Sequence, residues 1–170
     1  MKAIILLLLI SFNLHAQPDK GTLKYMDYKY GFRDVKFEME LDSFPSENMI
    51  FQYIDKGQKI YKRNNDILKI GDIDIKDIQY VFYQNKLMGI IITIDGILDR
   101  DNILEILNEM YGHGDKPTDD ELYFWTGKKA TCLYNEMNDE IIISITSNKL
   151  MTEFEDQQNI KSKNKAESDF

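Results

Sequence analysis

From Met49 onward, the pattern of hydrophobic and polar positions in the middle third of the chain is typical of extended β-strands. Residues 49–54 and 58–62 form two candidate strands around a turn at Gly57. Residues 87–94 form a further candidate strand, which contains three consecutive isoleucines at 90–92. Because these isoleucines leave the strand without a polar face, we expect it to be buried on both faces at the centre of a sheet.

Before that strand, Ile73 and Ile75 alternate with acidic neighbours. The apolar positions change phase at Asp77 and then resume at Ile78, Tyr80 and Phe82. Such a shift predicts a β-bulge or a bend. The pair Asn85–Lys86 suits the hairpin turn that leads into residues 87–94.

Nearer the N-terminus, residues 23–32 also read as a strand. Tyr28, Tyr30 and Phe32 alternate with polar or small residues, which favours an extended conformation. Asp42 is a candidate cap for a short helical turn that follows.

Residues 100–111 show the period of an amphipathic helix. Ile103, Leu107 and Met110 stand at helical spacing. Gly112 follows the last apolar residue, where a left-handed C-terminal cap favours glycine. We therefore expect one principal helix whose apolar stripe packs on the sheet.

The C-terminal part predicts three more strands, at residues 121–126, 129–135 and 140–147. A short helix fits residues 150–158, and residues 161–170 form a polar tail that we expect to be disordered. Runs of strands with one strong helix predict an α+β fold, with a mainly antiparallel sheet and one principal helix packed on it.

The first sixteen residues have the layout of a secretory signal peptide. Lys2 supplies the positive start, an apolar run follows at residues 3–10, and Ala16 precedes the expected cut. The apolar run is too short to span a bilayer. Removal of residues 1–16 would leave a single α+β domain at residues 17–160 and the polar tail.

The net charge of the chain limits the classes of partner that it can bind. The chain has 21 basic and 29 acidic residues, for a net charge of −8, and cleavage would also remove Lys2. Such a chain repels nucleic acid and anionic lipid headgroups, so we expect neither as a partner. Gln17 stands where a bacterial lipoprotein would carry its lipid-bearing cysteine. These observations predict an exported protein, periplasmic or secreted, without a stable membrane anchor; they do not fix its oligomeric state.

Candidate chemistry is sparse. His113 is the only histidine after the leader, and Cys132 is the only cysteine, so the mature chain can form neither a typical multi-histidine zinc site nor an intramolecular disulfide. The acidic run from Asp72 to Asp77 fails as a calcium loop because Lys76 occupies a ligand position. We therefore assign no catalytic residue, no metal ligand and no cofactor.

Two features remain as a candidate binding surface: the aromatic strand near residue 125 and the acidic loop after the helix. Exposed aromatic side chains can stack on sugars or anchor a protein, although ordinary cross-strand packing also explains them. The acidic loop is either a loose cation site or a solvated surface. The candidate binding residues are Trp125, Tyr123, His113, Asp115, Asp119 and Asp120.

Three fragments resemble small exported bacterial proteins that are mostly uncharacterised: YGFRDVKFEMELDSF (residues 30–44), LEILNEMYG (104–112) and FWTGKKATCLY (124–134). The helix ending in Tyr-Gly and the tryptophan hairpin are also loosely similar to the layout of the outer-membrane assembly lipoprotein BamE and of β-lactamase inhibitor proteins. The chain departs from the first in lacking the lipid-bearing cysteine and from the second in lacking disulfides. The resemblance implies architecture and no functional residue.

These observations favour a non-enzymatic binding or interaction module of the bacterial envelope, with a protein or glycan partner. A carboxylate-dependent hydrolase is the first alternative, although no acidic pair stands out. An inhibitor or immunity-type protein that blocks a basic enzyme is the second.

Overall fold

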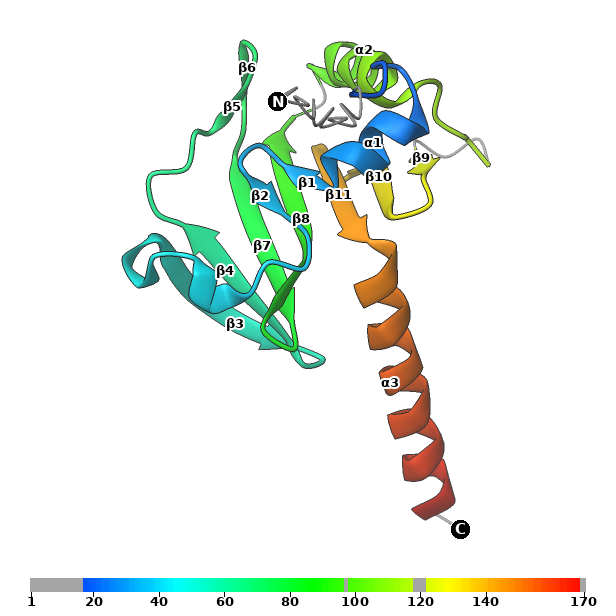
Figure 1. Cartoon of the computed structure of the whole chain (residues 1–170). Coiled ribbons are helices and arrows are strands. Elements are labelled where there is room, and N and C mark those ends of the chain that lie inside the picture. The colour runs from blue at the N-terminus through cyan, green and yellow to red at the C-terminus, as the bar shows by residue number, and fades with distance from the viewer. Residues whose placement is uncertain (1–16, 97, 118–121, 169–170) are drawn as a thin grey trace, which may run out of the picture.

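The computed structural model of the chain describes residues 17–96, 98–117 and 122–168. Its centre is an antiparallel sheet of seven strands (Figure 1). The strands follow one another across the sheet in the order β3 (Met49–Asp55), β4 (Gln58–Arg63), β7 (Asp77–Tyr83), β8 (Lys86–Asp95), β11 (Glu140–Ser147), β10 (Ala130–Met137) and β9 (Leu122–Thr126). The α+β fold with a mainly antiparallel sheet is therefore confirmed.

Strand β8 lies at the centre of the sheet, as the isoleucine run predicts. It is paired with β7 on one side and β11 on the other. Ile90 and Ile92 are buried in the main core, whereas Ile91 packs against a second cluster of buried residues. Both faces of this strand are therefore occupied by protein.

Tight turns join the neighbouring strands. Gln84 and Asn85 both have positive φ, at 48° and 65°, and connect β7 to β8. The turn thus begins one residue earlier than the pair Asn85–Lys86 predicts. Asn138 and Asp139, at 56° and 62°, connect β10 to β11 in the same way. Two successive left-handed residues match the twist of a two-residue hairpin.

Helix α2 (Arg100–Tyr111) has the bounds that the sequence predicts. It buries Ile103, Leu107 and Tyr111, and Gly112 closes its C-terminus with φ of 88° and a backbone bond to the Asn108 carbonyl. The helix contributes to a continuous core that extends from Tyr25 to Ile145 along the sequence.

The predicted strand at residues 23–32 is wrong over most of its length, because Leu23–Lys29 is helix α1. Thr22 caps it by accepting a hydrogen bond from the Tyr25 amide at 3.2 Å. Tyr25 and Met26 turn into the core, and the alternating tyrosines that suggested a strand fall across the end of the helix. Over so few residues the two periods cannot be distinguished.

Short elements follow α1. A small hairpin is formed by β1 (Gly31–Phe32) and β2 (Val35–Lys36), and two 3₁₀ turns follow, η1 (Leu41–Ser43) and η2 (Ser46–Asn48). The turn at Asp42 is therefore present, but Glu40 occupies the N-cap position, with no side-chain cap. A second small hairpin, β5 (Lys69–Ile70) and β6 (Ile73–Asp74), projects as an arm at the same end of the sheet as α2 (Figure 1).

The C-terminal segment differs from the predicted short helix and disordered tail. Helix α3 (Asn148–Ser168) begins directly after β11 and includes residues 161–168. Its first turns pack Leu150, Met151 and Phe154 against the second cluster, formed by Ile60, Val81, Tyr83 and Met88. A polar segment without glycine or proline is compatible with a solvated helix as well as with disorder, which explains the difference.

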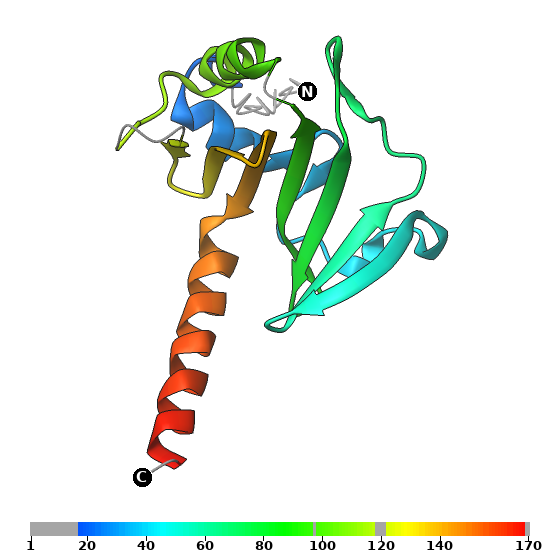
Figure 2. The same ribbon diagram turned by 180° about the vertical axis from the view of Figure 1, so that it is seen from behind.

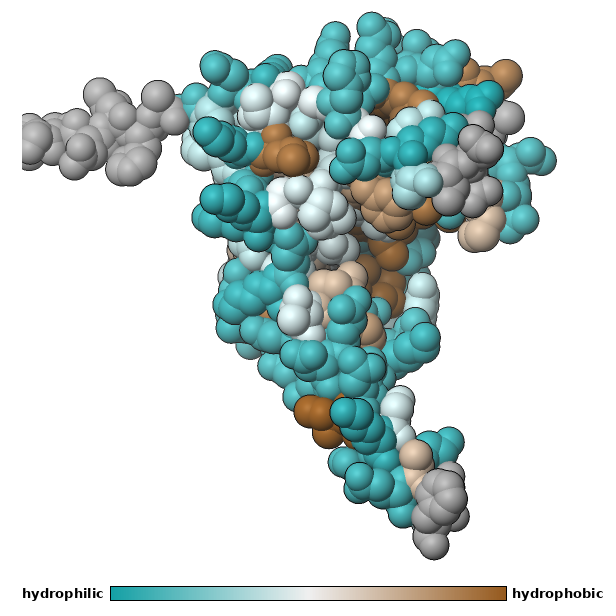
Figure 3. Space-filling model, turned by 90° about the vertical axis from the view of Figure 1, so that its right-hand side faces the viewer, coloured by the Kyte–Doolittle hydropathy of each residue, from teal (hydrophilic) through white to brown (hydrophobic). Residues whose placement is uncertain are grey.

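The far end of α3 projects from the body of the protein (Figure 2). Hydrophilic side chains cover most of this end (Figure 3). None of the helices in the described ranges is both long and apolar enough to cross a membrane.

Candidate functional site

Trp125, the first predicted binding residue, lies inside the protein. Only 1% of its surface is exposed. Its indole N–H donates to the Gly112 carbonyl at 2.7 Å, and its ring stacks on Tyr123 at 6.3 Å. The cross-strand packing interpretation of this residue therefore describes its position, and Trp125 offers no surface to a ligand.

The loop after α2 pairs with the same strand through its backbone. The Asp115 amide donates to the Phe124 carbonyl at 2.8 Å, and the Phe124 amide donates back at 2.9 Å. The Lys116 ammonium lies 5.2 Å from the centre of the Tyr123 ring. The structure thus places Asp115 beside the strand that carries Tyr123 and Trp125, and the backbone pairing with Phe124 attaches the loop to the sheet edge.

The other predicted residues do not join that group. His113 is exposed and lines a shallow depression on α2 together with Asp101, Glu105 and Glu109. Asp119 and Asp120 lie outside the described residues. The predicted binding residues near residue 125 therefore do not form one surface. Trp125 packs in the core, whereas His113 lies beside an open acidic face of α2.

Buried titratable groups serve the packing of the protein. Cys132 is fully buried, and this burial raises the pKa of its thiol, so the reactive thiolate is disfavoured. The Tyr80 hydroxyl donates to Asp66, which also accepts from the Arg33 guanidinium at 3.0 Å. Within the described ranges, no group of three or more histidine, cysteine or acidic side chains is arranged to hold a metal ion.

A second polar cluster joins α1 to α3. The Tyr30 hydroxyl lies 2.6 Å from Glu38 Oε1 and 2.7 Å from Ser147 Oγ, and Lys149 pairs with Glu38. Burial and the neighbouring Glu38 carboxylate raise the pKa of Tyr30 to about 12. Lys149 and Tyr30 in turn hold the pKa of Glu38 below its ordinary value. The cluster fixes the start of α3 on the body.

Strand β3, which is the first strand of the sheet order, departs from ordinary packing. Four of its large apolar side chains are about half exposed: Ile50 at 49%, Phe51 at 50%, Tyr53 at 49% and Ile54 at 61%. We call these four residues the β3 edge surface. Among the described residues, β3 has a neighbouring strand only on its β4 side.

The β3 edge surface has apolar side chains on both faces of the sheet. The Phe51 ring packs edge-on against Tyr61 at 5.5 Å, whereas the Tyr53 hydroxyl reaches Gln79 at 3.4 Å. The pairing with β4 shifts register between Phe51 and Tyr53, so a bulge at Gln52 separates the two faces.

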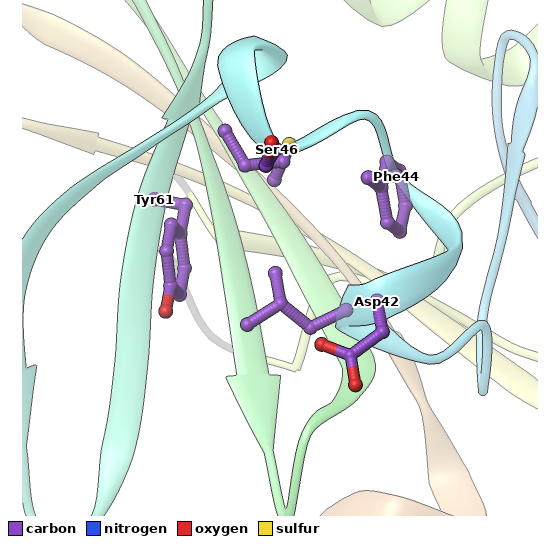
Figure 4. Close-up of a pocket in the computed structure, with 6 residues that line it drawn as sticks. Asp42, Phe44, Ser46 and Tyr61 are labelled. Carbon is purple, nitrogen blue, oxygen red and sulfur yellow. The ribbon is translucent and has the colours of Figure 1, made fainter.

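A pocket of about 450 Å³ adjoins this surface. We call it the edge pocket. Leu41, Phe44, Met49 and Tyr61 supply its apolar walls, and Asp42 and Ser46 supply its polar groups. Figure 4 shows Tyr61 on one side of the pocket and Phe44 and Asp42 on the other. The segment from η1 to η2 thus forms one wall, and strands β3 and β4 form the other.

The sequence predicted the β3 strand but not its exposure. The run Met-Ile-Phe-Gln-Tyr-Ile has apolar residues on both faces, a pattern that normally indicates a buried strand. Only the strand order places it at an edge.

Comparisons with known proteins add no identity, since no protein-family model, no curated protein and no solved structure matches the chain. The resemblance to small exported proteins therefore stays a prediction.

Proposed function

We propose that this protein is a non-enzymatic binding module that takes up an extended segment of a partner protein along β3. The observation that carries this proposal is the β3 edge surface, four large apolar side chains half exposed on an edge strand. Natural proteins usually cover or charge such an edge. An added strand would supply main-chain hydrogen bonds to the edge and cover the apolar side chains.

The edge pocket indicates what the partner segment should contain. Its apolar walls suit a long aliphatic stem, and the exposed Asp42 carboxylate in its lining favours a cationic end. The net charge of −8 also favours a basic partner. We therefore infer an extended segment in which apolar residues alternate and one lysine or arginine enters the edge pocket.

Selection from a phage-displayed library of random linear peptides tests this proposal. Enriched peptides, made synthetically, are titrated into the protein by calorimetry. The variant Ile54→Lys should weaken binding by at least about tenfold, because it places a charge in the β3 edge surface. The matched control is Ile160→Lys on α3, whose side chain is similarly exposed at 56%, and it should bind as the wild type does.

Two results would overturn the proposal. One is a selection that enriches no binding peptide. The other is a set of peptides whose affinity is the same for Ile54→Lys as for the wild type and the Ile160→Lys control.

We also propose that the protein acts outside the cytoplasm. The support is the leader pattern of residues 1–16 in the sequence, which lie outside the described residues. Mass spectrometry of the protein from the cells that make it should find an N-terminus at Gln17. An intact Met1 on cytosolic protein would contradict export.

A further inference from the structure

A second cavity, of about 400 Å³, is lined by residues of the main core, whereas α3 packs on the second cluster. Ile92, Ile143 and Ile145 line it from the sheet, and Leu107 and Met110 line it from α2. The β1 strand and the arm formed by β5 and β6 also contribute to its lining. Its volume falls within the range of small-molecule sites.

The charged residues that line this cavity are all positive. Lys29, Arg33 and Lys69 are its charged residues, and it contains no acidic residue among those the structure describes. Ile92 and Ile143 are 1% and 2% exposed, whereas the Lys69 side chain is 58% exposed. The cavity therefore has an apolar interior and a cationic rim.

The three cationic side chains differ in the hydrogen bonds and ion pairs that they already form. The Arg33 guanidinium is fixed by Asp66 and by the carbonyls of Ile67 and Lys69. Lys69 pairs with Asp74 at 3.1 Å, but both side chains are mostly exposed, so this pair is weak. Lys29 forms no ion pair within the described ranges. Two lysines can thus turn toward an anion at the rim, beside an arginine held in place.

We propose that this cavity binds an amphipathic organic anion, with its alkyl chain over the isoleucines and its anionic head between Lys29, Arg33 and Lys69. Burial of the alkyl chain removes apolar surface from water, which is favourable, so the chain supplies affinity and the rim supplies selectivity. A neighbouring depression lined by Asp72, Glu105 and Glu109 would repel the same head. This binding is independent of the β3 edge surface.

Calorimetric titration with sodium decanoate tests the proposal, with decanol and decyltrimethylammonium as neutral and cationic arms. Decanoate should bind more tightly than decanol, and the cation should bind most weakly. The double variant Lys29→Gln, Lys69→Gln should lower decanoate affinity by about tenfold and leave decanol affinity unchanged. The control pair Lys24→Gln, Lys128→Gln removes the same charge away from the cavity lining and should change neither.

A tryptophan variant tests the cavity itself. Met110→Trp should fill it and lower the affinity of decanoate and decanol alike. Asn102→Trp, on the same helix but lining the neighbouring depression, should bind both as the wild type does. Circular dichroism of each variant shows whether the fold is retained before binding is compared.

Vesicles separate the two sources of an anionic amphiphile. Cosedimentation with phosphatidylglycerol vesicles, lost in the Lys29→Gln, Lys69→Gln variant, assigns the site to a lipid headgroup and chain. Decanoate binding without cosedimentation assigns it to a free amphiphile. No binding in either assay, or decanoate affinity that is unchanged in the rim variant, overturns the proposal.

Discussion

The two edges of the sheet are built in opposite ways. At the β9 edge, Trp125 is 1% exposed and Asp115 pairs with Phe124 through two backbone hydrogen bonds. At the β3 edge, four large apolar side chains are between 49% and 61% exposed. One edge is attached to a loop, and the other presents apolar side chains without a partner strand among the described residues.

This difference separates residues that stabilise the protein from residues that are available for binding. An unprotected apolar edge is an aggregation hazard unless something limits its pairing. Here the bulged Gln52 limits it, since its side-chain amide donates to the Ile50 and Phe51 carbonyls at 3.1 and 3.3 Å. The β3 edge thus keeps its apolar side chains exposed while two of its carbonyls are already bonded.

The largest expected effect concerns the β9 edge. Trp125→Ala should lower the free energy of unfolding by about 3–5 kcal/mol, because it empties a buried site and removes the bond to the Gly112 carbonyl. Phe51→Ala, which removes a half-exposed ring at the other edge, should cost less than about 1 kcal/mol. Urea unfolding measures both. Similar losses in the two variants would break the comparison.

A smaller effect concerns the turn between β9 and β10. The Asp27 carboxylate accepts hydrogen bonds from the amides of Lys128 at 2.8 Å, Lys129 at 2.7 Å and Ala130 at 3.2 Å. Asp27→Ala should therefore lower the free energy of unfolding by about 1–3 kcal/mol. Asp72→Ala, which removes an exposed carboxylate, is the control and should change it by less than about 0.5 kcal/mol.

The Asp27 contact also shows what the sequence could not predict. The Gly127–Lys128 turn is visible in the sequence, but its partner lies about a hundred positions earlier, in a segment predicted as a strand. In the same way, the sequence singled out Trp125 for its chemistry and could not predict that Gly112 and Tyr123 would enclose it. The pattern of apolar residues was sufficient to predict α2 and β8, because α2 buries one face and β8 buries both faces.

The exposure of β3 could not be predicted for a related reason. Hydrophobicity predicts a strand, but its place in the sheet depends on which strands pair, and that information is non-local. Helix α3 was underpredicted because its polar residues carry no burial period beyond its first turns. The residues of the edge pocket come from two separate segments, residues 41–49 and Tyr61, and no spacing in the sequence connects them.

Acid should weaken the attachment of helix α3 to the body of the protein. Lys149 and Tyr30 lower the pKa of Glu38 below 4.5, so the stabilisation from Glu38 is complete above that pH and is lost as the pH falls through the lower, folded-state value. The wild type should therefore lose more stability between neutral pH and pH about 3 than Glu38→Gln does. Urea midpoints across pH measure this, and parallel curves for the two proteins would contradict it.

The smallest expected effect on stability is the one that most sharpens the comparison. Ile54→Lys changes a side chain that is 61% exposed, so the free energy of unfolding should change by less than about 0.5 kcal/mol. Met137→Lys, at 52% exposure on β10, is a matched control on another strand. Urea unfolding should not distinguish the two variants, whereas peptide binding should be weakened only in Ile54→Lys. If Ile54→Lys unfolds more than about 1 kcal/mol more easily than Met137→Lys, the β3 edge contributes to the fold and the contrast between the two edges is wrong.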